Sequence, residues 1–178
     1  MLFVKKAREA HCSRTSSRTV ERMRKQISKI TSNVPATAQA WLDLENIAAV
    51  ELTSEDQAFP IESALLGQGT VGWRAAEPGV QTIRVIFEQP QRLKRISLVF
   101  VETEAQRTQE FTLKWSPDRG NSFQEIVRQQ WNFSPPTTIR ETEEYQVDLP
   151  GVTALELTIV PDISGGTARA SVKSLRVS

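Results

Sequence analysis

Cysteine and histidine are almost absent from the sequence. Among 178 residues there is one cysteine, Cys12, and one histidine, His11. A single cysteine excludes an internal disulfide framework and a cysteine-based zinc site. A single histidine excludes nearly every mechanism that depends on this side chain, and both residues fall in a stretch that reads as a tail. The sequence therefore predicts no metal site built from cysteine or histidine.

Long hydrophobic runs are also missing. No apolar stretch approaches the roughly 20 residues that a bilayer-spanning helix needs, so no membrane span is expected. The chain opens with Met1-Leu2-Phe3-Val4, and Lys5 and Lys6 follow at once. A secretory signal has the opposite order, with positive charge before the apolar segment. These features predict a soluble, cytoplasmic protein.

The charged residues divide the chain into two unequal parts. Residues 1–40 carry nine basic and two acidic residues, whereas residues 41–178 carry 13 basic and 19 acidic residues. The formal charges are therefore +7 and −6. All four tryptophans lie in the second part, and residues 31–38 have the composition of a linker. We expect a basic N-terminal arm, 1–40, followed by one folded domain, 41–178.

The arm contains a short apolar stripe at helical spacing. Val20, Met23, Ile27 and Ile30 recur every three or four residues among basic side chains. Such a helix could dock on an anionic surface such as nucleic acid or membrane. The stripe is short and has no aromatic anchor, which favours a solvated helix or a disordered start, and a start codon assigned too far upstream would give the same arm. We expect an arm that is helical at most in part, and no nucleic-acid partner.

From residue 47 onward, apolar residues alternate with polar ones. The alternation is clearest in residues 83–87, 96–100, 111–115, 145–149 and 155–159. A period of two is typical of strands with one face on a core and the other on water. Near the C-terminus one parity ends at Val172 and the opposite one begins at Leu175. A bulge between these two residues would keep both sets facing inward.

Turn residues separate these segments. They include Glu77-Pro78-Gly79, Gln89-Pro90-Gln91, Ser134-Pro135-Pro136, Pro150-Gly151 and Ser164-Gly165-Gly166. The most informative turn is 116–120, where Pro117 presets φ, Asp118 can accept a backbone hydrogen bond and Gly120 supplies a positive φ. No helical period after residue 45 is long enough for a crossover. About eight short strands with short turns predict an all-β protein, an antiparallel jelly-roll sandwich.

Three segments in this order resemble the discoidin-like domain family, also called the coagulation factor five/eight type C domain family. Residues 60–65 lead through a glycine-bearing loop to residues 72–75, where the family has an apolar turn, a glycine loop and a conspicuous tryptophan. Residues 79–87 are similar to a family strand of alternating apolar residues. Residues 110–123 look like the family's strand ending in Ser-x-Asp-Gly, with an aromatic residue opening the next strand. The resemblance spans most of residues 41–178 and implies a galactose-binding-like jelly roll.

The chain departs from this family at a loop that commonly holds a structural calcium ion. Leu66 stands where the family often has an aspartate before the glycine. Without that carboxylate a calcium ion loses a natural oxygen ligand, although Glu62, Thr70 and backbone carbonyls could still contribute. Calcium therefore stays open and is not predicted. The terminal cysteine pair of the secreted animal members is also absent, which fits a chain without an export signal.

Two patterns that resemble enzyme motifs have simpler explanations. Residues 67–72 match the dinucleotide fingerprint G-x-G-x-x-G, which works only where the last glycine enters a helix. Pro78 would stop such a helix within two turns, so we interpret the segment as a glycine loop between strands. Acidic residues gather at Glu102, Glu104, Glu141, Glu143 and Glu144. A glycosidase needs two carboxylates facing each other across a cleft, and neighbouring acids in a turn are normally just solvated, so we expect no catalytic residues and no enzyme.

The predicted ligand-binding residues are Trp131, Asn132, Arg128, Arg74 and Arg119. Sugar sites combine an aromatic plate with polar groups that bond hydroxyls, and Trp131 and Asn132 lie where a strand runs into a proline turn. Arg128 and Asn132 share one parity, opposite to Trp131. Trp131 could instead continue the core, and Arg74 and Arg119 could be ordinary surface residues. Trp73 and Trp115 are expected in the core, and Trp41 is expected to pack the entering chain against the sandwich.

The resemblance implies a non-catalytic binding module with carbohydrate as the ligand class, recognised by loops at one end of the jelly roll. Fold alone does not determine function. The alternative is an intracellular module for protein–protein interaction or assembly that uses the same fold, and it is favoured by the missing export signal. The predicted partner is therefore a carbohydrate or a protein.

Overall fold

The computed structural model describes residues 40–67 and 70–178. The predicted arm and its apolar stripe lie outside the described residues, apart from Ala40. The described elements are α1 (Leu44–Ile47), β1 (Ala48–Leu52), α2 (Glu62–Leu65), β2 (Trp73–Pro78), β3 (Gln81–Val101), β4 (Arg107–Ser116), β5 (Gln124–Phe133), β6 (Arg140–Val160), β7 (Arg169–Val172) and β8 (Ser174–Val177). Eight strands and two four-residue helices in this part of the chain confirm the prediction of an all-β fold.

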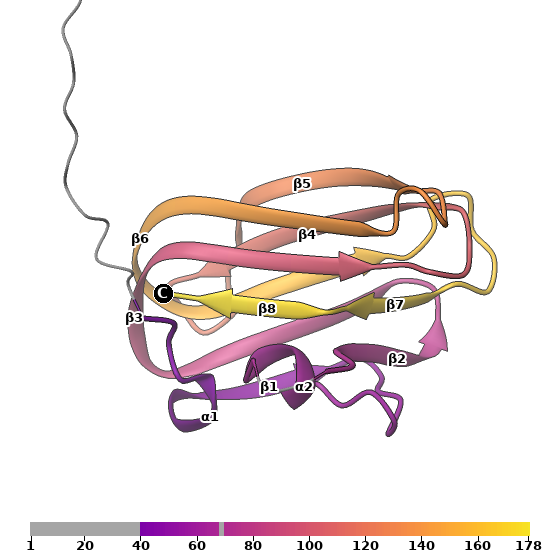
Figure 1. Cartoon of the computed structure of the whole chain (residues 1–178). Coiled ribbons are helices and arrows are strands. Elements are labelled where there is room, and N and C mark those ends of the chain that lie inside the picture. Colours follow the sequence, from indigo (N-terminus) through magenta and orange to yellow (C-terminus); the bar gives the residue numbers. More distant parts are fainter. Residues whose placement is uncertain (1–39, 68–69) are drawn as a thin grey trace, which may run out of the picture. The chain divides into compact units, whose positions relative to one another are not determined.

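Two long strands, β3 and β6, run through both layers of a sandwich. They pair antiparallel, and their register shifts between Ile86 and Arg95 of β3. Both strands turn back there (Figure 1). The first half of β3 and the second half of β6 lie in one layer, in the order β1-β3-β6-β4-β5. The other halves form the second layer with β8, and every pairing among the described strands is antiparallel, as a jelly roll requires.

The predicted turns at Gln89-Pro90-Gln91 and Pro150-Gly151 are wrong in one respect. These residues lie inside continuous strands and mark the bends by which β3 and β6 pass from one layer to the other. Gly151 has φ of 70°, a left-handed conformation that glycine adopts at no steric cost. The sequence shows the irregularity correctly, but whether it ends a strand or bends it depends on pairing with a distant segment.

The core lies between the two layers and confirms the alternation seen in the sequence. Ile83, Val85 and Phe87 of the first layer are buried, as are Ile96 and Leu98 of the second. Phe111 on β4 meets Phe100 on β3 across the core, with ring centroids 5.1 Å apart. Burial of these faces is the main stabilising contribution that a sandwich has.

The tryptophans lie as the sequence indicates, whereas the C-terminal strands differ from the prediction in one respect. Trp73 is buried, and Trp115 packs against the core. The Trp41 ring lies 3.9 Å from the guanidinium carbon of Arg95 and fixes the entering chain to the sandwich. Val172 and Leu175 both face inward. The change of parity between them is a break rather than a bulge, because β7 pairs with β2 whereas β8 pairs with β3.

The predicted turn at residues 116–120 forms as its composition requires. Gly120 has φ of 87° and Arg119 has φ of 59°. The buried Ser116 hydroxyl accepts a hydrogen bond from the Gly120 amide at 2.8 Å and donates one to Asp118 at 2.6 Å. The Arg119 amide donates to the Thr153 hydroxyl on β6 at 2.7 Å. The turn is therefore fixed to the bend of β6.

We expect Phe111→Ala to lower the free energy of unfolding by about 3–5 kcal/mol, because it removes the ring that joins the two layers and leaves a cavity. Chemical denaturation measures this loss. Ile139→Ala, at an exposed apolar position, is the control and should change stability by less than about 1 kcal/mol. Equal losses in the two variants would contradict this account of the core.

Candidate ligand-binding cleft

Loops from several strands meet at one end of the sandwich, which we call the loop end: residues 70–72, 79–80, 102–106, 134–139 and 161–168. Backbone hydrogen bonds join them, from Glu102 to Ile139 at 2.9 Å, from Ile163 to Thr108 at 2.9 Å and from Gly79 to Ala168 at 3.1 Å. The large apolar side chains that are exposed in the described part of the chain all lie here, at Val71, Val80, Ile139 and Ile163. Exposed apolar surface gathered at one place indicates a contact surface.

A cleft of about 790 Å³ opens at the loop end. Arg74, Arg169 and Lys173 line it from β2, β7 and the residue after β7, and residues 101–105 and 162 also contribute to its lining. Phe59 and Val71 add apolar surface. The cleft therefore combines charged groups with apolar patches, which is the composition of many small-ligand sites.

A buried arginine organises the loops around this cleft. The side chain of Arg107, at the start of β4, is 4% exposed. It donates to the Glu102 carboxylate at 2.7 Å and to the Pro161 carbonyl oxygen at 2.7 Å. One guanidinium thus joins the loop after β3 to the loop after β6.

The partner of Arg107 is held as an anion. Burial opposes the charged form of Glu102, but the amides of Glu104 and Ala105 donate to its carboxylate at 2.8 Å and 3.1 Å, and together with Arg107 they lower its pKa below the ordinary value. A carboxylate bound in this way is a structural support for the loop rather than a proton donor.

A second ion pair fixes Arg74, which lines the cleft. Its Nε and Nη2 donate to one oxygen of Asp56 at 3.3 Å and 2.7 Å, and the guanidinium lies 3.8 Å from the ring centre of Phe59. Arg169 reaches the same Asp56 oxygen at 3.7 Å. The hydrogen bonds from Arg74 lower the pKa of Asp56. Since a guanidinium has five N–H groups, Arg74 keeps further donors for a ligand in a fixed orientation.

Positive and negative side chains balance around the cleft. The basic members are Arg74, Arg107, Arg169 and Lys173, and the acidic members are Glu102, Glu104, Asp162 and, behind Arg74, Asp56. No strong field of one sign arises, so the cleft suits an uncharged polar ligand better than a polyanion.

Within residues 40–67 and 70–178, no three side chains of the types His, Cys, Asp and Glu lie together as a metal site. Leu66, the departure from the calcium-loop pattern, packs against the core. Neither of the described helices has the length and apolar character needed to cross a membrane.

No protein-family model and no curated protein matches the chain. Solved structures do match. A family 32 carbohydrate-binding module of AlyQ, solved with 4,5-unsaturated mannuronic acid, superposes with a TM-score of 0.57 at 16% identity over 78% of this chain and 98% of that chain. A pectin-binding carbohydrate-binding module gives 0.56 at 16% identity over 74% and 90%. The family 32 module of NanJ from C. perfringens, in complex with galactose, gives 0.53 at 13% identity over 73% and 92%.

The chain has the discoidin-like, galactose-binding-like fold. The resemblance stated from three sequence segments is therefore confirmed as a resemblance of fold.

In this galactose-binding-like domain only one of the predicted ligand-binding residues, Arg74, lines the cleft. Arg128 and Asn132 lie on the exposed outer face of β5, where Arg128 pairs with Glu125 at 3.3 Å and Asn132 accepts a hydrogen bond from Thr108 at 2.6 Å. Arg119 lies in the turn after β4, at the opposite end of that strand from the loop end. The binding roles of Arg128, Asn132 and Arg119 stay predictions.

Trp131 lies on the inward face of β5 and packs against the core. It stands opposite Gln109 in the β4–β5 register. Its Nε1 is buried and has no hydrogen-bond partner among the described residues, and the same holds for the Gln109 amide. The alternative that Trp131 continues the core agrees with this position, and its role as a stacking platform stays a prediction.

Several side chains that shape the cleft are not predicted from the sequence. Arg107 has the same parity as Phe111 and Leu113, so the alternation could have marked it as a buried charge in need of partners. Nothing local marks Asp56 or Phe59, since they reach Arg74 only through the pairing of the folded chain.

A polar group of side chains closes one flank of the sandwich between β5 and the first half of β6. We call it the flank cluster: Gln129, Glu141, Glu143 and Tyr145. Gln129 donates to Glu143, and the Tyr145 hydroxyl donates to Gln129 at 3.0 Å. Glu141, which is 7% exposed, stands beside Phe100 in the register. Burial, and then the neighbouring Glu143, raise the pKa of Glu141 to about 7, while burial and Glu143 also raise the pKa of Tyr145.

We expect Arg107→Met to lower the free energy of unfolding by about 3 kcal/mol, because it removes the buried hydrogen bonds of the guanidinium and leaves the half-buried carboxylate of Glu102 without its cation. The double variant Arg107→Met, Glu102→Gln should regain part of this loss, since the unpaired charge is then gone. Urea denaturation of the three proteins measures both effects. A double variant no more stable than Arg107→Met would show that the ion pair does not carry the effect.

The flank cluster predicts a fall in stability as the pH rises. Glu141 has a higher pKa in the folded protein than the ordinary 4.5, so the folded state binds the extra proton. The stabilisation that the protonated Glu141 carboxyl group gives the folded state is complete below about pH 4.5. It is lost as the pH rises through about 7. The only histidine of the sequence, His11, lies outside the described residues, so few of the described groups other than Glu141 titrate in this window.

The measurement is the melting temperature between pH 5 and pH 8.5. Glu141→Gln should flatten the decline, because a neutral amide stands in for the protonated carboxyl group. Glu144→Gln, on the exposed side of the same strand, serves as the control and should keep the decline. An unchanged pH profile in Glu141→Gln would contradict the assignment.

Proposed function

We propose that this domain is a non-catalytic carbohydrate-binding module that holds a glycan in the loop-end cleft. The observation that carries the proposal is the Arg74 guanidinium, fixed by Asp56 and stacked on Phe59 at the cleft. Sugars present hydroxyl groups and apolar C–H faces, and rigid donors beside apolar side chains match both. Structural neighbours that were solved with galactose or with an unsaturated mannuronic acid support this ligand class.

The carboxylates of the cleft support binding rather than glycoside hydrolysis. Hydrolysis needs an acid with a raised pKa and a second carboxylate across the scissile bond. Glu102 and Asp162 instead have lowered pKa values: amides and Arg107 hold Glu102 as an anion against the effect of burial, and Ser164 does so for Asp162. The raised pKa of Glu141 belongs to the flank cluster, whose members do not line the cleft.

A protein-binding module is the second candidate, and one observation favours it. Val71, Val80, Ile139 and Ile163 expose apolar surface at the loop end, as protein contact surfaces do. In that case the partner would cover several loops at once. A glycan would instead occupy the cleft itself.

We expect Arg74→Gln to weaken glycan binding at least tenfold, because it removes the charge-assisted donors fixed at the cleft. Arg92→Gln is the matched control, since Arg92 makes a similar two-pronged pair with Asp148 at 2.7 Å and 2.8 Å at the bend of β3, away from the cleft. The measurement is a glycan array followed by calorimetry on the polysaccharides that bind, with melting temperatures recorded for both variants.

Trp131→Ala in the same assay compares the cleft with the predicted platform on β5. A binding loss with an unchanged melting temperature would move the site to Trp131, whereas a lower melting temperature with binding intact would make Trp131 a core residue. An array without any hit, together with a co-purifying protein lost on Val80→Ser, would favour the protein-binding candidate.

A further inference from the structure

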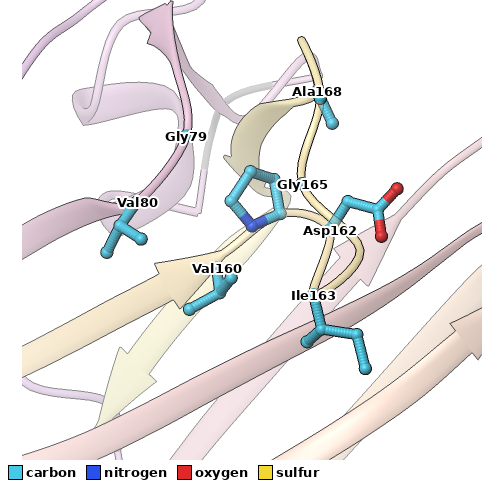
Figure 2. A pocket seen from close by; sticks show the side chains of 9 residues that line it. Gly79, Val80, Val160, Asp162, Ile163, Gly165 and Ala168 are labelled. Atoms are coloured by element: carbon cyan, nitrogen blue, oxygen red, sulfur yellow. The ribbon is translucent and has the colours of Figure 1, made fainter.

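A small apolar pocket lies beside the cleft at the loop end. Its volume is about 260 Å³, and it lies between the turn from β2 to β3 and the loop from β6 to β7. Val80 and Ile163 stand at this pocket with 59% and 49% of their surface exposed. Figure 2 shows them near Val160, Gly79 and Gly165. Large aliphatic side chains left in water beside a hollow indicate that an apolar group of a ligand covers them.

Glycines keep this pocket open. Gly79, Gly165 and Gly166 line it with φ angles of 84°, 87° and 105°. The position that a Cβ atom would take has no other atom within 4 Å at any of the three glycines. The space that a side chain would fill is therefore empty at these positions. The positive φ also disfavours any residue with a side chain. Parts of the wall are therefore bare backbone, and a small group can approach it closely.

The pocket is continuous with the cleft but too small for a ligand of its own. Asp162, Gly165, Gly166 and Ala168 line both. Ligand sites for whole small molecules usually measure at least about 300 Å³, which this pocket does not reach. Its size and position suit a substituent on a ligand that lies in the cleft.

The chemistry of the lining selects an uncharged substituent with an apolar tip. Among the described residues, Asp162 is the one titratable side chain that lines the pocket. One of its carboxylate oxygens, Oδ1, accepts hydrogen bonds from the amide and hydroxyl of Ser164 at 3.0 Å and 2.6 Å. The carboxylate points away from Val80 and Val160 (Figure 2). The opposite side is aliphatic. A sugar hydroxyl would lose water there without gaining a partner, which is unfavourable.

An acetyl group meets these requirements on a sugar. It places its methyl carbon roughly 3.8 Å from the ring carbon that carries the substituent, so the ring can stay in the cleft while the methyl group reaches the pocket. A methyl group attached directly to the ring would need the ring itself to enter. The distance from the ring to the pocket therefore favours an acyl substituent over the ring-attached methyl group of a deoxy sugar.

We propose that Val80 and Ile163 form an acyl-binding subsite, so that the domain prefers acetylated glycans to the same glycans without acetyl groups. This proposal rests on the proposed carbohydrate-binding function and specifies its ligand class. Burial of one methyl group against these side chains corresponds to a preference of about three- to tenfold.

The test compares binding to matched pairs of glycans by calorimetry. The pairs are O-acetylated xylan with its deacetylated form, and N-acetylglucosamine oligomers with glucose oligomers of equal length. The proteins are the unchanged domain, the double variant Val80→Ser, Ile163→Ser, and the control Ile139→Ser, which alters an exposed apolar residue of the loop end outside both linings. All these positions are exposed, so folding should be preserved, and melting temperatures check it.

We expect the unchanged domain to bind the acetylated member of each pair more tightly. The double variant should lose this preference, and Ile139→Ser should keep it. Equal binding to both members of each pair overturns the subsite and leaves the carbohydrate-binding function standing. No binding to any glycan overturns both proposals. A concentration-dependent dimer that disappears in the double variant also overturns the subsite, because the pocket would then be covered by a second copy of the chain.

Discussion

The loop end depends on one buried cation. Arg107 sits at an inward position of β4, where its neighbours in parity are Phe111 and Leu113, and a charge there is costly unless it is paired. Glu102 and the Pro161 carbonyl oxygen supply the partners, each at 2.7 Å. Because these partners come from the loops after β3 and after β6, satisfying the guanidinium also fixes the two loops that border the cleft. Lysine could not replace it, since a single ammonium group lacks the planar fork that reaches both at once.

An ion pair also fixes the exposed wall of the cleft. Asp56 holds Arg74, Arg74 stacks on Phe59, and Arg169 approaches the same carboxylate. The donors are therefore oriented before a ligand arrives, which lowers the entropic cost of binding. Asp56 also neutralises part of the positive charge of Arg74 and Arg169 before a ligand binds. A polar, nearly neutral cleft with fixed donors suits the hydroxyl-rich ligands that we propose for it.

The sequence predicts the strands well because burial on alternate residues is a local property. Ile83, Val85 and Phe87 are buried as their spacing requires, and the turn at Gly120 forms because its residues specify it. The bends at Pro90 and Gly151 are different, since the same residues can end a strand or bend it and only pairing decides. The site is predicted least well. The sequence singles out Arg74 as a candidate. Arg107, however, takes one of its partners, the Pro161 carbonyl oxygen, from a loop 54 residues further along the chain, and no local pattern brings that loop to it.

The charge distribution of the chain agrees with a neutral ligand for the domain. Residues 41–178 carry a formal charge of −6, whereas residues 1–40 carry +7. An acidic domain repels polyanions at long range, so any attraction to nucleic acid or anionic membranes would have to come from the residues before the domain. Within the domain, the ion pairs at the cleft remove what local positive field Arg74 and Arg107 would create. What remains for recognition is hydrogen bonding and apolar contact, and these two forces act on uncharged sugars.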